Sequence, residues 1–320
     1  MSATLTVRST DEVPAREAKG YWGEMVSRSF GRLNSDTYGD DSFRGRIAYL
    51  GLGEVQIGTL EASRHRVVRV AGSRGASDPG HLKLVVQRRG RCLFEQNGRR
   101  AWLRPGDWSL YDTTESYIVS APDPVDLHVL MLPRADVLRG RAELDELLVR
   151  RLRGSGMGSV ACAAISRALG DAAAGVALPS GEGARIVELV HLALLEQAGA
   201  RTEPLRRSML RERAKAFIDE HLGDTELDVD RVAAAMGCSK RAVHQAFELE
   251  DCSFNRYVWE RRLAAVRADL EAPGAATRAI GDIAFSWGFS SAAHFSRAFR
   301  AVYGVSASEW RKGLRPGAPA

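Results

Sequence analysis

Residues 280–312 read IGDIAFSWGFSSAAHFSRAFRAVYGVSASEWRK, and apolar residues recur at helical spacing on both sides of a glycine. On a helical wheel, Phe295 and Phe299 share one face with Ala292 and Val302, so these four predict a buried face. The glycine can supply the positive φ that ends a helix, and a serine after it can cap the next one. The stretch therefore predicts two helices joined by a tight turn.

This arrangement occurs twice in the chain. VAAAMGCS (232–239) aligns with IAFSWGFS (283–290) at an offset of 51 residues, and each motif ends on the serine that we expect to cap the next helix. After one inserted residue the offset is 52, and Phe247 matches Phe299. Such internal repeats mark a repeated structural unit. We predict an all-helical domain with two helix-turn-helix units over residues 205–317, with the units at about 228–249 and 279–302.

The outward face of each second helix carries small, hydrogen-bonding and cationic side chains. In a DNA major groove, Arg can bind guanine through two hydrogen bonds and Gln can bind adenine. A solvated helix face is the alternative for one such helix. Two tandem copies with the same turn and cap favour recognition helices.

Residues 280–312 resemble the signature of the AraC/XylS family of bacterial transcription regulators. Ala307 stands where the family usually has proline, and His294 holds a position that is often aromatic. The first copy, LDVDRVAAAMGCSKRAVHQAF, resembles the weaker first motif of the family. The positions of the main motif that match are Asp282, Ile283, Ala284, Gly288, Phe289, Ser291, Phe295, Arg297, Phe299, Arg300, Gly304, Ser306, Trp310 and Arg311.

The resemblance implies that the two second helices enter successive major grooves of a double-stranded DNA operator. It also implies that a long helix around residues 253–270 joins the two units. The side chains at the family's base-facing positions are Arg241, His244, Gln245, Ala292, Ala293, His294 and Arg297. Phosphate contacts are expected from Lys240, Ser291 and Arg300, and from helix N-termini.

Residues 40–132 are strand-like, with short apolar runs such as LKLVVQ (82–87) and DWSLYD (107–112) separated by turn signals. CLFEQ, then Asn97-Gly98, then RRAWL predicts a β-hairpin with a type I′ turn. Many short strands with regular turns favour a sandwich or barrel. We therefore predict an α+β chain whose strands precede its helices.

The segments WGEMVSRSFG (22–31), ASRHRVVR (62–69) and GRRAWLRPGDWSLYDT (98–113) resemble the cupin-like barrel that is the sensor domain in a subset of the same family. The resemblance covers about residues 12–138 and implies a small-molecule effector. Ligand pockets combine aromatic side chains with a few polar groups. The effector-lining residues that we expect are His65, Gln87, Trp102, Trp108 and Tyr111.

Cupins can also be metal-dependent enzymes, so a cupin-type enzyme fused to a DNA-binding domain is an alternative. Their metal site needs an H-x-H pair on one strand. Here His65 is followed by Val67 at the second position, and His81 and His128 have no partner spacing. Asp107 could suggest acid–base catalysis, but an Asp after Pro-Gly more often fixes a turn. We predict no metal, no cofactor and no enzymatic activity.

An alkyl-transfer DNA-repair protein can carry the same DNA-binding unit, but it needs clustered cysteines at a zinc site. The four cysteines here are widely spaced, which also fits a reducing cytosol. The N-terminus has no apolar segment typical of a signal peptide, and no run is long enough for a membrane helix. We therefore predict a cytoplasmic protein without a membrane partner.

Residues 139–200 read as a helical dimerisation or linker region. Leu189, Leu192 and Leu195 form an apolar stripe that predicts a homodimer contact, with coverage of the barrel as an equal alternative. We expect the linker to the helical domain to be QAGARTEPLRR (197–207).

The net charge of +5 permits a nucleic-acid partner. The full prediction is a one-component transcription regulator, an activator by the family's habit, that would also contact RNA polymerase. A repressor of the same family is the alternative.

Overall fold

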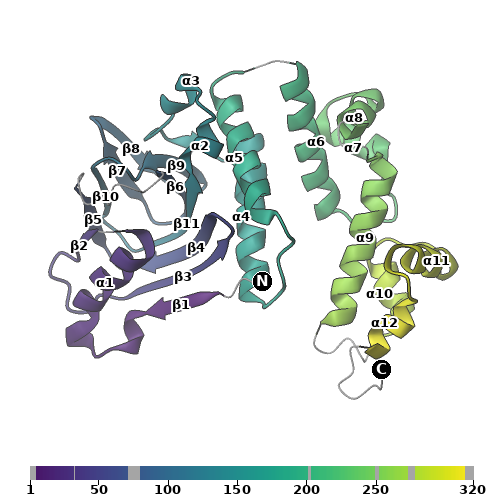
Figure 1. Cartoon of the computed structure of the whole chain (residues 1–320), viewed down its shortest axis with the longest axis horizontal. Helices are drawn as coiled ribbons and strands as arrows, with labels where there is room; N and C mark the ends of the chain where they lie inside the picture. Colours follow the sequence, from purple (N-terminus) through teal and green to yellow (C-terminus); the bar gives the residue numbers. More distant parts are fainter. Residues whose placement is uncertain are drawn as a thin grey trace. The chain divides into compact units, whose positions relative to one another are not determined.

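The chain divides into two units, Met1–Arg201 and Thr202–Ala320. This computed structural model describes residues 5–31, 33–70, 80–200, 203–248, 252–272 and 278–313 (Figure 1). Residues 201 and 202 of the expected linker lie outside the described residues, as do residues 249–251, 273–277 and 314–317 of the predicted helical domain. The helical region 139–200 belongs to the first unit.

Two antiparallel sheets build the first unit, in the orders β1-β3-β4-β11-β6-β9-β12 and β2-β5-β10-β7-β8. The strands of the larger sheet are β1 (Thr6–Ser9), β3 (Gly45–Leu52), β4 (Val55–Ala62), β6 (His81–Arg89), β9 (Asp107–Asp112), β11 (Val125–Pro133) and β12 (Leu152–Arg153). Those of the smaller sheet are β2 (Asn34–Asp36), β5 (His65–Arg69), β7 (Cys92–Gln96), β8 (Arg99–Leu103) and β10 (Tyr117–Ala121). The predicted α+β order, with strands before helices, is confirmed.

The predicted β-hairpin is present between β7 and β8. The two strands pair antiparallel, with Gln96 opposite Arg99. Between them, Asn97 has φ 49° and Gly98 has φ 74°. Positive φ at both central residues is what a type I′ turn requires, so the prediction is confirmed.

The two sheets pack face to face, with the Tyr111 ring of the larger sheet against the Tyr117 ring of the smaller one, and the space between them is the barrel interior. The other face of the larger sheet is turned toward helices. Because side chains alternate along a strand, Lys83, Val85 and Gln87 of β6 share the interior face. The other face is covered by helices α4 (Met157–Ala173) and α5 (Glu182–Gln197) (Figure 1). On that face, His128 Nε2 lies 3.1 Å from the Ser166 hydroxyl of α4.

Helix α5 packs within the chain through its leucines. Leu189, Leu192 and Leu195 are all nearly inaccessible. Nδ1 of His191 donates a hydrogen bond of 2.7 Å to the carbonyl of Val137, in α2 (Arg134–Leu138). The stripe therefore covers the barrel, and its prediction as an exposed dimer contact is wrong, because the leucines already have partners within the chain.

One end of the barrel is closed by α1 (Ala18–Phe30), and a short helix, α3 (Ala142–Asp145), follows α2. Trp22 of α1 is fully buried and packs against Phe43 and His65, with ring centroids 5.2 and 5.4 Å away. Helix α1 is thus part of the barrel's core.

The second unit is entirely helical in its described part. Its helices are α6 (Glu203–Glu220), α7 (Val229–Met236), α8 (Lys240–Phe247), α9 (Phe254–Glu271), α10 (Ile280–Ser286), α11 (Ala292–Tyr303) and α12 (Ala307–Gly313). The long helix α9 contributes to two cores: Phe254 and Val258 pack with α6–α8, whereas Leu263 and Val266 pack with α10–α12. It joins the two helix-turn-helix units, as predicted (Figure 1).

Candidate nucleic-acid interface and ligand site

The first helix-turn-helix unit consists of α7 and α8. A carboxylate oxygen of Asp228 accepts a hydrogen bond of 2.8 Å from the Arg231 amide and caps the start of α7. Gly237 ends α7 with φ 64°, and the Ser239 hydroxyl caps α8 by accepting from the Ala242 amide at 3.2 Å. The predicted glycine turn and serine cap are both confirmed in this unit.

The second helix-turn-helix unit consists of α10 and α11, and one more residue separates its turn glycine from the cap of its second helix. Gly288 has φ 78°, as predicted. The cap of α11 is Ser291, whose hydroxyl accepts from the His294 amide at 3.4 Å. The expectation of Ser290 is wrong because the inserted residue lies before the cap, so the offset from Ser239 is already 52 at this point.

The side chains predicted to face DNA lie on open surfaces of α8 and α11. Nine of the ten are exposed and Gln245 is half-buried, which leaves their groups accessible to a nucleic acid. The exposed ones are Lys240, Arg241, His244, Ser291, Ala292, Ala293, His294, Arg297 and Arg300. What each would contact remains a prediction.

Two residues expected in the core of α11 are on its surface instead. Phe295 and Phe299 are buried as predicted, but Ala292 is exposed and Val302 is 52 % exposed. The neighbouring helices cover only a narrow arc of α11, centred on the two phenylalanines. Ala292 and Val302 lie at the margins of that arc, so their placement in the core is wrong.

Three of the exposed side chains have partners that hold them. Nζ of Lys240 lies 2.6 Å from a carboxylate oxygen of Asp230, and the hydrogen bond raises the pKa of Lys240. The His294 ring meets Trp259 edge-on, with centroids 4.6 Å apart, and His244 meets Phe254 in the same way at 6.4 Å. The two imidazoles therefore rest against aromatic residues of α9.

Arg262 of α9 holds the two helix-turn-helix units together and was not predicted from the sequence. It is only 5 % exposed, and it donates hydrogen bonds to the carbonyls of Leu222 (3.0 Å) and Asp224 (2.6 Å). Its guanidinium carbon lies 2.7 Å from where a Cβ on Gly288 would be. A charged residue four positions from Val258 and from Val266, inside an apolar stripe, is the signal that could have found it.

Three of the five predicted effector-lining residues point into the barrel. Tyr111 and Gln87 lie on the interior face of the larger sheet, 3 % and 1 % exposed. His65 is buried beside Trp22, and its Nδ1 donates to the Ser63 carbonyl at 2.9 Å. Burial lowers the pKa of His65.

The other two predicted residues do not line the interior. Trp102 is 47 % exposed and lies under the guanidinium of Arg91, 5.5 Å from its carbon. Trp108 faces the helices, where its indole N–H donates to the Arg153 carbonyl at 3.1 Å. Because β9 alternates, Trp108 points away from Tyr111, so its placement in the barrel is wrong, as is that of Trp102.

The interior contains polar groups that the sequence reasoning missed. Lys83 and Arg69 are buried there, the Tyr117 hydroxyl is buried facing Arg69, and the Ser109 hydroxyl is buried with no hydrogen-bond partner among the described residues. Burial, with a smaller effect of Arg69, lowers the pKa of Lys83 to about 7. The sequence could have indicated Lys83, because it is four residues before Gln87 in the strand LKLVVQ and therefore faces the same side of the sheet.

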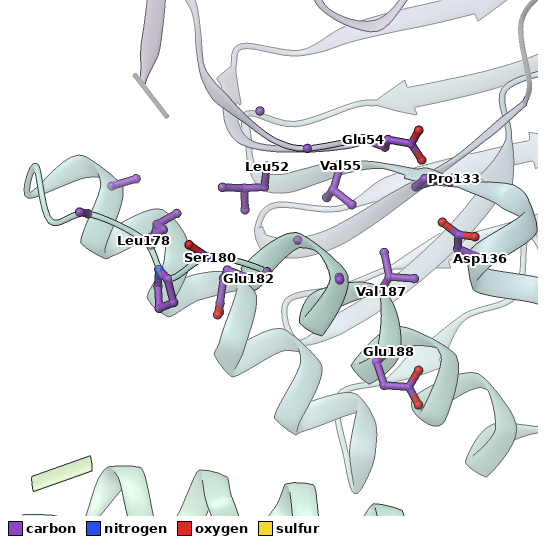
Figure 2. A pocket seen from close by; sticks show the side chains of 18 of the residues that line it. Leu52, Glu54, Val55, Pro133, Asp136, Leu178, Ser180, Glu182, Val187 and Glu188 are labelled. Atoms are coloured by element: carbon purple, nitrogen blue, oxygen red, sulfur yellow. The ribbon is translucent and has the colours of Figure 1, made fainter. Parts of the chain in front are cut away.

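A separate pocket of about 980 Å³ lies outside the barrel, between the β3–β4 turn, α2 and the start of α5 (Figure 2). Leu52, Val55 and Val187 give it apolar walls, and Glu54 and Asp136 gather at one end. These carboxylates favour a neutral or cationic molecule over an anion.

No group of three His, Cys, Asp or Glu side chains among the described residues could hold a metal ion, and the four cysteines form no disulfide with one another. No helix in the described part of the chain is long and apolar enough to cross a membrane.

Family models match both units. Residues 22–196 match an AraC-binding-like domain, and residues 232–313 match a helix-turn-helix domain. Together they cover most of the barrel with its helices and most of the two helix-turn-helix units.

Relatives extend this similarity. The chain is 27 % identical over 318 residues to the transcriptional activator NphR of Rhodococcus sp., covering 95 % of this chain and 91 % of NphR. It is 35 % identical over 98 residues to the transcriptional activator RhrA of Rhizobium meliloti, covering 31 % of each chain. The crystal structure of the AraC-like transcriptional activator CuxR aligns with a TM-score of 0.51 and 18 % identity, covering 89 % of this chain and all of that one. This last likeness shows a shared fold.

Proposed function

The chain belongs to the AraC family of transcription regulators, and from this premise we propose that it activates transcription in response to a small molecule bound by its first unit. As a family member it is a DNA-binding regulator with an effector-binding domain, and not an enzyme. The observation that supports activation is the similarity to NphR, a transcriptional activator, along nearly the whole of both chains.

The proposed DNA contacts follow from the exposed faces of α8 and α11. Arg241, Gln245 and Arg297 carry the groups that can bind base edges, and Ala292 and Ala293 allow close approach of the helix to the groove. Lys240, Ser291 and Arg300 would contact phosphates. Arg262 fixes the relation between the two helices, which suits an operator with two adjacent major-groove segments.

Effector binding would bias states that already exist. A ligand that binds one arrangement of the chain more tightly shifts the population toward it. We propose that the barrel is where this difference arises and that the protein acts as a homodimer. The dimer contact would have to involve a surface other than the buried leucines of α5.

The test is selection of genomic DNA fragments by the purified protein, followed by transcription from the selected promoters with RNA polymerase. We expect a repeated bipartite site and more transcript when the protein is added. A bipartite site with less transcript would identify a repressor instead. Weak binding that does not distinguish sequences would contradict the assignment of α8 and α11 as recognition helices.

A further inference from the structure

Two cations are buried in the barrel interior, one from each sheet. Lys83 of β6 is 5 % exposed and Arg69 of β5 is 6 % exposed. Among the described residues neither has a carboxylate partner in an ion pair, and the charge that acts on Lys83 is that of Arg69. Burying a charge without a counter-charge is costly, and the lowered pKa of Lys83 reflects that cost, so packing alone does not explain two basic side chains at this place.

The two cations belong to one cluster with two tyrosines. Tyr111 is the strand neighbour of Lys83, and Tyr117 is the strand neighbour of Arg69. The tyrosine rings lie 4.6 Å apart across the two sheets. The Ser109 hydroxyl beside Tyr111 is buried with no hydrogen-bond partner in the described part of the chain, and the buried Tyr117 hydroxyl faces the Arg69 guanidinium. The cluster thus combines positive charge, hydroxyl groups and aromatic surface.

The C-terminal end of α1 closes this cluster. Nζ of Lys83 lies 3.6 Å from the centroid of the Phe30 ring, and a Cβ on Gly31 would lie 2.9 Å from the Arg69 guanidinium. The negative face of an aromatic ring attracts a cation, but less strongly than a carboxylate does. Phe30 therefore occupies the position where an anion would be more stable.

We propose that this cluster is the effector site and that the effector is a small organic carboxylate. Its carboxylate would lie between Lys83 and Arg69, and its apolar body would pack on Tyr111 and Tyr117 after Phe30 moves aside. The inference rests on the proposed function, since it names the ligand class for the sensor domain. The outer pocket is less suited to an anion because Glu54 and Asp136 border it.

The protonation of Lys83 gives the proposal a specific signature. With a pKa of about 7, Lys83 is mostly neutral at pH 8, and a carboxylate beside it would raise that pKa and cause proton uptake. The other titratable groups facing the cluster do not change charge there. Arg69 is cationic at this pH. Burial keeps His65 neutral, raises the pKa of Tyr117 and Cys92 to about 12, and raises that of Tyr111.

The experiment is calorimetric titration of the full chain near pH 8 in two buffers of different ionisation enthalpy. The probes are benzoate, phenylacetate, 3-phenylpropionate and hexanoate, each beside its primary amide. We expect at least one carboxylate to bind at least tenfold more tightly than its amide, with uptake of between half a proton and one proton.

Variants locate the site. Lys83→Met should abolish the proton uptake and weaken binding at least tenfold. Arg69→Met should weaken binding and keep only part of the uptake, because Lys83 without its positive neighbour is already more protonated before the ligand binds. Lys83→Met removes a buried charge, so we expect it to fold. Glu54→Gln, in the outer pocket, is the matched control and should leave binding unchanged.

Three results would overturn the proposal: no binding of any carboxylate at about 10 mM, equal binding of the amides, or uptake that persists in Lys83→Met. Selection of genomic DNA by the same preparation separates this inference from the proposed function. If the protein binds DNA specifically but binds no carboxylate, only the proposed class of effector is contradicted. If it binds a carboxylate but does not recognise DNA specifically, the proposed function as a regulator is contradicted and the carboxylate site stands.

Discussion

The two helix-turn-helix units have the same order of helices and turn, but their turns differ in how tightly they pack against the rest of the domain. A Cβ on Gly237 in the first turn would meet nothing within 4 Å. A Cβ on Gly288 in the second would lie 2.6 Å from the Leu222 carbonyl oxygen and 2.7 Å from Arg262. The first turn is on the surface. The second turn packs against Leu222 and Arg262, and we call this contact between the two helix-turn-helix units the joint. One local motif can thus have two different roles in packing.

The largest expected effect comes from the two turn glycines. Gly237→Ala should cost about 1–2 kcal/mol, because alanine is strained at positive φ. Gly288→Ala adds an overpacked joint and should cost about 2–5 kcal/mol in all. Hydrogen exchange of the amides in α8 and α11 measures both changes. Equal costs for the two variants would mean that the second turn is not part of the joint.

Arg262→Met tests the joint from the other side. It leaves the buried carbonyl of Leu222 and the partly buried carbonyl of Asp224 without their donor, which should cost about 2–4 kcal/mol. The two recognition helices should then tolerate more than one spacing between their DNA segments, measured by binding to operators with inserted base pairs. Arg256→Met, in the same helix but in an exposed ion pair with Glu260, should change neither property. A variant of Arg262 that still requires one spacing would refute its positioning role.

Substitutions of Arg297 and Arg241 allow the two helix-turn-helix units to be compared in how they recognise DNA bases. Arg297→Ala should cost about 1–3 kcal/mol of operator binding and relax specificity at one base position. Arg241→Ala should do the same at a position in the other major-groove segment. Binding to operators with single base changes measures this, and Arg297→Lys keeps the charge but loses the two-pronged hydrogen bond. Unchanged specificity and affinity in Arg297→Ala would remove it from the base-reading set.

The local features of both units could be predicted from the sequence because they depend on nearby residues. Gly237 ends α7, and Gly288 lies in the turn that follows α10. Phe247 and Phe299 lie in the two cores at matching positions. The cap at Ser291 was misplaced by one residue, because an insertion in a repeat can lie on either side of a serine pair. The place of Arg262 within an apolar stripe could be seen in the sequence, but its hydrogen-bond partners could not be predicted, because they are 40 and 38 residues away.

The barrel interior was harder to predict for the same reason. Strand alternation places Gln87 and Tyr111 on one face, but it cannot say which face is the interior. Trp108 therefore seemed a good pocket residue, although it packs beneath helices. Lys83 and Arg69 meet only because two sheets stack, and the sequence separates them by a stretch that includes residues 71–79, which lie outside the described residues.

Arg300 and Lys240 extend the comparison to the phosphate contacts. Arg300→Ala should weaken binding to all sequences and reduce the slope of log affinity against log salt by about 1. Lys240→Ala should reduce this slope by less, because in the protein without DNA the charge of Lys240 is already balanced in part by the carboxylate of Asp230. Salt titrations on one operator and one unrelated duplex give both slopes. A slope that does not change in Arg300→Ala would exclude it from the phosphate contacts.

The smallest effect should follow from releasing Lys240. Its ion pair with Asp230 is exposed on both sides, so breaking it should change the stability of the fold little. Asp230→Asn removes a negative charge close to the proposed DNA surface and should strengthen binding to all sequences by a few-fold at low salt, and by less at high salt. In a Lys240→Ala background the same substitution should gain less, because the freed cation is gone. An equal gain in both backgrounds would mean that Asp230 acts on DNA directly and that Lys240 does not contact phosphate.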